Sequence, residues 1–138
     1  MKQNVPIAEI MTVDLITLNP KQTLYEAEDL FRKHKIRHIP VVDGKKLLGV
    51  LSYSDLLKIS YADVNDDEDS VSSIVYDMYS ISQIMAKTLV TVSPNETIKE
   101  VTQTLAKHSF HSLPVVEKEE LKGIITTTDL LNYFLEQY

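Results

Sequence analysis

Gly49-Val-Leu-Ser-Tyr-Ser-Asp-Leu-Leu57 decides the fold of this chain, because the same pattern returns as Gly123-Ile-Ile-Thr-Thr-Thr-Asp-Leu-Leu131. The two stretches are 74 residues apart, and at that one offset residues 7–57 align with residues 81–131 without a gap. Of the 51 aligned pairs, 18 are identical. A half-domain of this size buries little surface alone, so the duplication predicts two copies that pack together about a pseudo-twofold axis.

The composition narrows the class of protein. A length of 138 residues with 43% hydrophobic residues predicts one compact domain with a core, and no apolar run approaches the roughly 20 residues of a membrane helix. The absence of cysteine excludes disulfides and thiol catalysis and fits a cytoplasmic location. A net charge of −6 argues against general nucleic-acid binding but allows an anionic ligand in a locally basic pocket.

Each copy is predicted to run β-α-β-β-α, which makes the fold class α+β. A helical turn, Ile-x-x-Ile-Met, opens each copy at Ile7 and Ile81, and a β-prone segment follows at 15–18 and 89–92. The next helices begin at the capping boxes Thr23–Glu26 and Thr97–Glu100. Their spacing predicts buried stripes of Leu24, Ala27 and Phe31 in one copy and Ile98, Val101 and Leu105 in the other. His34 and His108 are expected at the C-terminal ends of these helices.

Two strands and a helix complete each copy. The strands are predicted at 39–42 and 47–51, with counterparts at 113–116 and 122–125. The second hairpin turn, Glu117-Lys-Glu-Glu120, lacks the glycine of the first and is expected to differ in shape. Ser54-Asp55 and Thr128-Asp129 are predicted to supply N-caps for helices that begin at Leu56 and Leu130.

The repeats divide the sequence into residues 7–60, an acidic linker with a short helical segment at 61–80, and residues 81–136. The acidic run 63–69 does not match a calcium loop, because Glu68 and Ile74 replace the glycine and the bidentate glutamate that an EF-hand needs. Ile74, Val75, Met78 and Tyr79 suggest an amphipathic turn that re-enters the core or meets a partner.

Together these motifs resemble the CBS domain, and the pair resembles a Bateman module. The resemblance rests on Ile-x-x-Ile-Met, on the Pro-Val-Val strands at Pro40 and Pro114, and on the Gly-to-Asp segments at 49–55 and 123–129. It implies two related clefts between the repeats that hold adenosine-containing ligands: AMP, ADP or ATP, or else S-adenosylmethionine, NAD or a cyclic dinucleotide. It also implies a homodimer and an effector protein that the module regulates.

The repeated polar residues suit such a ligand on chemical grounds. A carboxylate beside a helix start, as at Asp55 and Asp129, can accept both hydroxyls of a ribose. Neighbouring serine and threonine hydroxyls, with helix amides behind them, suit phosphate oxygens, and Gly49 and Gly123 permit a close backbone approach. The alternative is that both carboxylates only cap helices.

The resemblance implies that each cleft combines residues of both repeats. Cleft A would be formed by Asp14, Ile36, Arg37, His38, Ile124, Thr126, Thr128 and Asp129. Cleft B would be formed by Val50, Ser52, Ser54, Asp55, Thr88, Phe110, His111 and Ser112. Arg37 is a permanent cation suited to phosphate, so cleft A is expected to take the more highly phosphorylated ligand. Phe110 is expected to lie against an adenine ring in cleft B.

The sequence carries no catalytic or metal-binding motif, so we expect a regulatory module and no enzyme or catalytic cofactor. Magnesium could accompany ATP, although no dedicated ligands for it are evident. The alternative function is an interaction or dimerisation module that binds nothing small.

Overall fold

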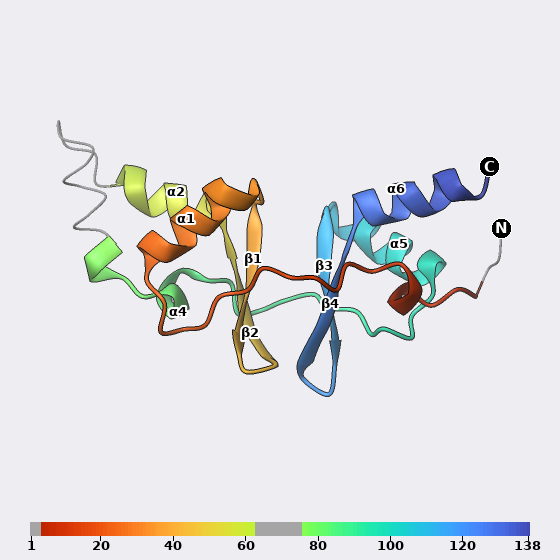
Figure 1. Cartoon of the computed structure of the whole chain (residues 1–138), viewed down its shortest axis with the longest axis horizontal. Coiled ribbons are helices and arrows are strands. Elements are labelled where there is room, and N and C mark those ends of the chain that lie inside the picture. Colours follow the sequence, from red (N-terminus) through yellow and green to blue (C-terminus); the bar gives the residue numbers. More distant parts are fainter. Residues whose placement is uncertain (1–3, 63–75) are drawn as a thin grey trace. The chain divides into compact units, whose positions relative to one another are not determined.

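The computed structural model describes residues 4–62 and 76–138, and its chain forms two compact units (Figure 1). The first unit consists of residues 16–89, and the second consists of residues 1–15 together with 90–138. The units therefore do not follow the repeats. The opening segment of each repeat belongs to the unit that the rest of the other repeat forms.

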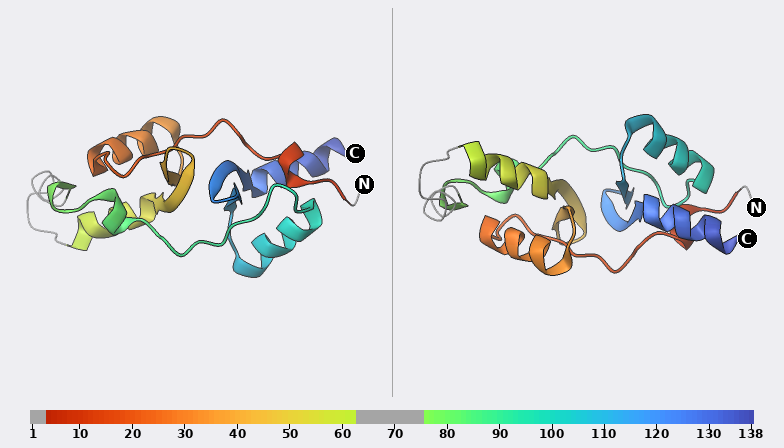
Figure 2. Two further views of the ribbon diagram at one scale, coloured as in Figure 1. Left: turned by 90° about the horizontal axis from the view of Figure 1, so that it is seen from below. Right: turned by 90° about the horizontal axis from the view of Figure 1, so that it is seen from above.

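The first unit packs two helices against a β-hairpin. Helices α1 (Leu24–His34) and α2 (Tyr53–Ala62) lie side by side against strands β1 (His38–Asp43) and β2 (Lys46–Ser52) (Figure 2). The short helix α4 (Ile81–Ile84) from the second repeat joins them. Ile81 of α4 and Met85, the residue after this helix, are buried in one cluster with Leu24, Ala27 and Phe31. The predicted stripe of α1 is thus confirmed.

The second unit repeats this arrangement. Helices α5 (Ile98–His108) and α6 (Thr127–Glu136) cover the hairpin of β3 (Ser112–Glu117) and β4 (Glu120–Thr126), and the 3-10 helix η1 (Ile7–Glu9) supplies the opening turn. Ile7 is buried with Ile98, Val101 and Leu105, which confirms the second stripe.

The local signals at the helix ends of α1 and α5 are confirmed, except that the capping box predicted at Thr97–Glu100 forms only its first half. Thr23 and Glu26 form the reciprocal capping box, and the Thr97 hydroxyl accepts the Glu100 N–H at 3.2 Å. Each helix ends at its predicted histidine, and the next residue, Lys35 or Ser109, is left-handed. One hydroxyl side chain thus satisfies an amide of the first turn that would otherwise lack a partner.

The start predicted for the last helix of each repeat is wrong. Helix α2 begins at Tyr53 and α6 at Thr127, so each starts three residues earlier than predicted. The Asp55 N–H donates to the Ser52 hydroxyl at 2.9 Å, and the Asp129 N–H donates to the Thr126 hydroxyl at 3.0 Å. The earlier hydroxyl of each Ser/Thr pair is the cap, and this places the aspartate at N3.

The β-prone segment near the start of each repeat forms less structure than predicted. Leu18 and Val92 each make a single parallel bridge, to Val41 and Val115 respectively. Asn19-Pro20 and Ser93-Pro94 follow at once and turn the chain, so pairing stops after one residue.

The two hairpin turns differ, as predicted. The first turn has its positive φ at Gly44, whereas Lys118 and Glu119 both have positive φ in the second, at 52° and 67°. Two consecutive left-handed residues are the signature of a type I′ turn, here built without glycine.

Residues 61–62 of the predicted linker belong to α2, and beyond them only residues 76–80 can be compared with the structure. The acidic run 63–69, Ile74 and Val75 lie outside the described residues. Met78 is 63% exposed, so it does not re-enter the core. Tyr76 is buried instead, and its ring makes an edge-to-face contact with Tyr25 of α1 at a centroid distance of 5.0 Å.

Candidate functional site

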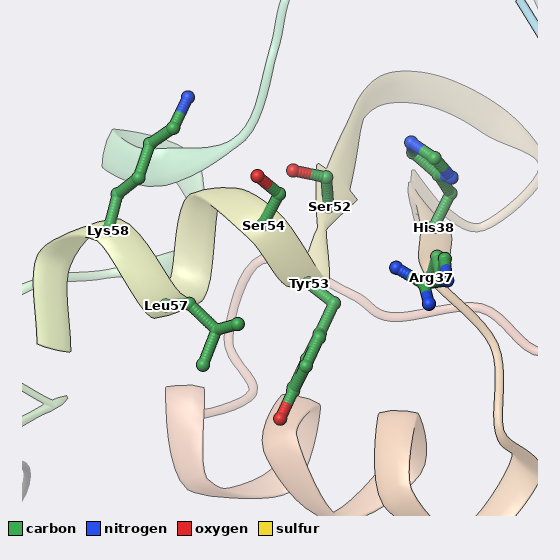
Figure 3. Close-up of a pocket in the computed structure, with 7 residues that line it drawn as sticks. All are labelled: Arg37, His38, Ser52, Tyr53, Ser54, Leu57 and Lys58. Atoms are coloured by element: carbon green, nitrogen blue, oxygen red, sulfur yellow. The ribbon is translucent and has the colours of Figure 1, made fainter. Parts of the chain in front are cut away.

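An open cavity of about 770 Å³ lies at the start of α2 in the first unit (Figure 3). Ser52 and Ser54 point to one side of the helix start, with Lys58 one turn further on, and Tyr53 and Leu57 point to the other side. Arg37 and His38 face this region from the start of β1. The cavity size falls in the range of roughly 300–1,000 Å³ that is usual for small-molecule sites.

Backbone pairing explains why these residues meet. His38 stands opposite Ser52 in the β1–β2 ladder, and the Tyr53 N–H donates to the Arg37 carbonyl at 2.8 Å. This bond holds the loop before β1 against the first turn of α2. A guanidinium and an imidazole are thereby placed beside two hydroxyls and the positive end of a helix dipole.

The structure therefore gathers residues that the sequence analysis assigned to different clefts. Arg37 and His38 were assigned to cleft A, whereas Ser52 and Ser54 were assigned to cleft B, and all four line one cavity. Lys58 also lines this cavity, although it was not among the predicted site residues. Its spacing of four from Ser54, on one face of a helix, is a signal that could have identified it.

Asp55 sits in the first turn of α2, directly after Ser54, but it is not one of the residues that line this cavity. Its carboxylate lies 3.8 Å from the Lys58 ammonium, which is an ion-pair distance but too long for a good hydrogen bond. Its side chain is 37% exposed. The oxygens of Asp55 can therefore accept further hydrogen bonds.

Asp129, the counterpart of Asp55, is held differently. Its carboxylate accepts hydrogen bonds from the Thr12 hydroxyl at 3.1 Å and from the Thr126 N–H at 3.0 Å. The residue that corresponds to Thr12 in the other repeat is Ala86, which has no hydroxyl. The Asp129 carboxylate is thus part of the helix cap, and its role in a ligand site stays a prediction.

Gly49 and Gly123, which open the repeated Gly-to-Asp segments, serve the fold as well. A Cβ at Gly123 would lie 2.8 Å from the Thr12 carbonyl oxygen and 2.8 Å from the Met11 sulfur. At Gly49 it would lie 2.7 Å from both the Ala86 carbonyl oxygen and the Met85 sulfur. The close approach predicted at these glycines is therefore made by the chain's own opening segments. The Ile-x-x-Ile-Met motif and the glycine motif are two sides of one contact.

The second unit has the same scaffold but different side chains at the corresponding positions. The Thr127 N–H donates to the His111 carbonyl at 2.9 Å, and Ser112 stands opposite Thr126 in the β3–β4 ladder. Phe110 is 41% exposed, and one face of its ring stacks on His108 at a centroid distance of 5.2 Å. Only its other face remains for a base.

The remaining predicted site residues fall into two groups. Val50 and Ile124 form backbone bridges to Ala86 and Thr12, so their main chains are committed to the fold. Exposed or half-buried side chains make up the second group: Asp14, Ile36, Thr88 and Thr128. The two halves of each predicted cleft belong to different units, and their combination stays a prediction.

The described residues offer no evident place for a metal or a membrane span. Within residues 4–62 and 76–138 there is no cluster of three or more His, Asp or Glu side chains that could hold a metal ion. None of the helices in this part of the chain is long and apolar enough to cross a membrane.

Comparison with known families agrees with this architecture. The family model for the CBS domain matches residues 7–62 and again residues 81–136, so the chain belongs to the CBS-domain family as a tandem pair.

Individual relatives cover nearly the whole chain. The CBS domain-containing protein YhcV of Bacillus subtilis is 31% identical over 124 residues, which are 90% of this chain and 81% of YhcV. The solved structure of AcuB from Vibrio cholerae, assigned to acetoin utilization, is 32% identical, with a TM-score of 0.79 over 96% of this chain and 92% of AcuB. CBSX2, solved in complex with AMP, is 22% identical, with a TM-score of 0.80 over 96% of this chain and 98% of CBSX2, and shows the shared fold.

Proposed function

We propose that this chain is a regulatory module that binds an adenosine-containing nucleotide (AMP, ADP or ATP) and passes its occupancy to a separate effector protein. The observation that carries the proposal is the first-unit cavity, which Arg37 lines together with Ser52 and Ser54 at the start of α2. This is the donor set that an anionic phosphate group requires. The complex of CBSX2 with AMP supports an adenosine ligand for this fold.

Each group has a role in this proposal. Arg37 pairs with a phosphate through its planar guanidinium fork, and His38 adds positive charge when it is protonated. The hydroxyls of Ser52 and Ser54 complete the phosphate shell. Asp55 accepts the ribose hydroxyls, because its carboxylate retains acceptor capacity that Asp129 has given to Thr12 and the backbone.

Signalling requires that the ligand bind one arrangement of the protein better than another. A differential affinity of about 1–3 kcal/mol is typical of such coupling. S-adenosylmethionine, NAD and cyclic dinucleotides share the adenosine moiety and belong in the same screen.

The test is thermal unfolding of the chain with each ligand in turn, beside Asp55→Ala and Asp129→Ala. A ligand at about 100 times its dissociation constant should add about 2.7 kcal/mol to the free energy of unfolding. We expect the ligand-induced shift to be lost in Asp55→Ala and retained in Asp129→Ala. The opposite pattern would move the ribose site to the second repeat.

A second candidate function, an interaction module, is favoured by the outer face of α6. Leu131 and Leu135 lie one turn apart and are 60% and 72% exposed. Such a stripe suits a homodimer contact. If no ligand shifts the unfolding midpoint, and light scattering shows a dimer that Leu135→Glu dissociates, this function replaces the nucleotide sensor.

A further inference from the structure

A second, smaller cavity of about 310 Å³ adjoins the first. The two cavities share Arg37 and Tyr53 as lining residues. The smaller one lies between the end of α1 and the start of α2, and its full lining is Phe31, Arg32, Lys35, Ile36, Arg37 and Tyr53. Three of these six side chains are cations, in a protein whose net charge is −6.

The basic lining is confined to one copy of the repeat. At the offset of 74 residues, Ala106 replaces Arg32, Ser109 replaces Lys35 and His111 replaces Arg37. Both copies fold in the same way, and Ser109 takes the same left-handed conformation as Lys35, with φ of 55° against 53°. The fold therefore does not require these three cations.

The three cations differ in how far their charge is already compensated within the protein. Arg32 forms an ion pair with Glu28 one turn earlier on α1, so part of its charge is compensated. Lys35 is exposed and follows the last residue of the helix, and Arg37 stands where the two cavities meet. The rings of Phe31 and Tyr53, with centroids 5.3 Å apart, form an apolar wall behind them. An apolar wall on one side lowers the local dielectric constant and so strengthens the attraction between cations and an anion.

We propose that the smaller cavity holds the terminal phosphates of a nucleoside triphosphate whose first phosphate contacts Arg37 from the larger cavity. The chain then distinguishes ATP from AMP by phosphate number, and Lys35 is the residue that makes the distinction. This inference rests on the proposed nucleotide-binding function.

The test is titration calorimetry of the full chain with AMP and with ATP, in EDTA and at near-physiological ionic strength. Lys35→Ser installs the residue that already occupies the equivalent left-handed position in the other repeat. Lys33→Ser is the matched control. It removes the same charge from the same basic run, but Lys33 lines neither cavity and is retained as Lys107 in the second repeat.

We expect wild type to bind ATP more tightly than AMP, and Lys35→Ser to weaken ATP about ten-fold, as for loss of one charge-assisted contact. AMP affinity should stay the same, and Lys33→Ser should change neither affinity. Arg32→Ala, which also installs the residue of the other repeat, should weaken ATP in the same direction.

Two results would overturn the inference. Equal wild-type affinities for AMP and ATP, with no selective effect of Lys35→Ser or Arg32→Ala, would remove the second cavity from the site while the proposed function stands. Absence of binding by either nucleotide to folded wild type would overturn the proposed function and this inference together.

Discussion

Replacing Asp129 by alanine should destabilise the protein far more than replacing its counterpart Asp55. The Asp129 carboxylate accepts the Thr12 hydroxyl at 3.1 Å and the Thr126 N–H at 3.0 Å, and it lies in the first turn of α6. A charge-assisted bond to a cap amide contributes about 1 kcal/mol, and the hydroxyl bond and the helix dipole each add about 0.5 kcal/mol. We therefore expect Asp129→Ala to lower the free energy of unfolding by about 2 kcal/mol.

Asp55→Ala is the matched control for this prediction. It removes an exposed ion pair with Lys58 and a favourable dipole interaction, which together contribute less than about 1 kcal/mol. The cap itself survives, because the Ser52 hydroxyl accepts the backbone N–H of residue 55, which any side chain leaves in place.

The assay is urea unfolding of the full chain, followed by circular dichroism, for both single variants and for Thr12→Ala with and without Asp129→Ala. The double-mutant cycle should give a coupling of about 0.5–1 kcal/mol between residues 12 and 129. Equal losses in the two aspartate variants, or no coupling to Thr12, would refute the view that Asp129 is committed to the fold and Asp55 is not.

Three further predictions follow from single contacts. Gly123→Ala should lower the free energy of unfolding by about 2–3 kcal/mol in the same assay, because the Cβ of the new alanine would lie 2.8 Å from the carbonyl oxygen of Thr12. A loss of under about 1 kcal/mol would mean that the opening segment can move aside without strain. The double change Lys118→Asn with Glu119→Gly should raise the free energy of unfolding by about 1 kcal/mol, since both positions have positive φ. An unchanged free energy of unfolding would count against strain in this turn. Burial raises the pKa of Tyr76 to about 12 from 10, so the unfolded chain releases this proton first as the pH rises. The free energy of unfolding of wild type should therefore fall by about 1–2 kcal/mol relative to that of Tyr76→Phe between pH 10 and pH 12. Parallel curves of stability against pH for the two proteins would contradict this.

Much of the fold could be predicted from sequence because its signals are local. The capping threonines, the buried stripes of α1 and α5 and the paired hairpins each depend on residues a few positions apart. The difference between the two turns was predictable for the same reason, since the first turn contains Gly44 and the second has Lys118 at that position.

What could not be predicted depends on contacts across the sequence. Thr12 and Asp129 are 117 residues apart, and no local pattern indicates that they meet. The same holds for the approach of Met11 to Gly123, by which an opening segment joins the unit of the other repeat. The start of α2 was misassigned because Ser52 and Ser54 can both cap a helix, and only the structure identifies which hydroxyl accepts the amide.

The candidate site was predicted in part. Arg37, His38, Ser52 and Ser54 were chosen from sequence, and they line one cavity. The resemblance instead divides these four residues between two clefts, each drawn from both repeats. The pairing of His38 with Ser52 in the hairpin instead follows from the register of β1 and β2.

Binding of an adenosine nucleotide at the start of α2 can be followed residue by residue by backbone amide NMR of the 15.7 kDa chain titrated with ATP. We expect saturable shifts at the amides of four residues that line the cavity, namely Arg37, His38, Ser52 and Ser54, and much smaller shifts at the four counterpart positions of the second repeat. Shifts concentrated at those counterparts, or no saturable shift anywhere in the folded chain, would contradict this expectation.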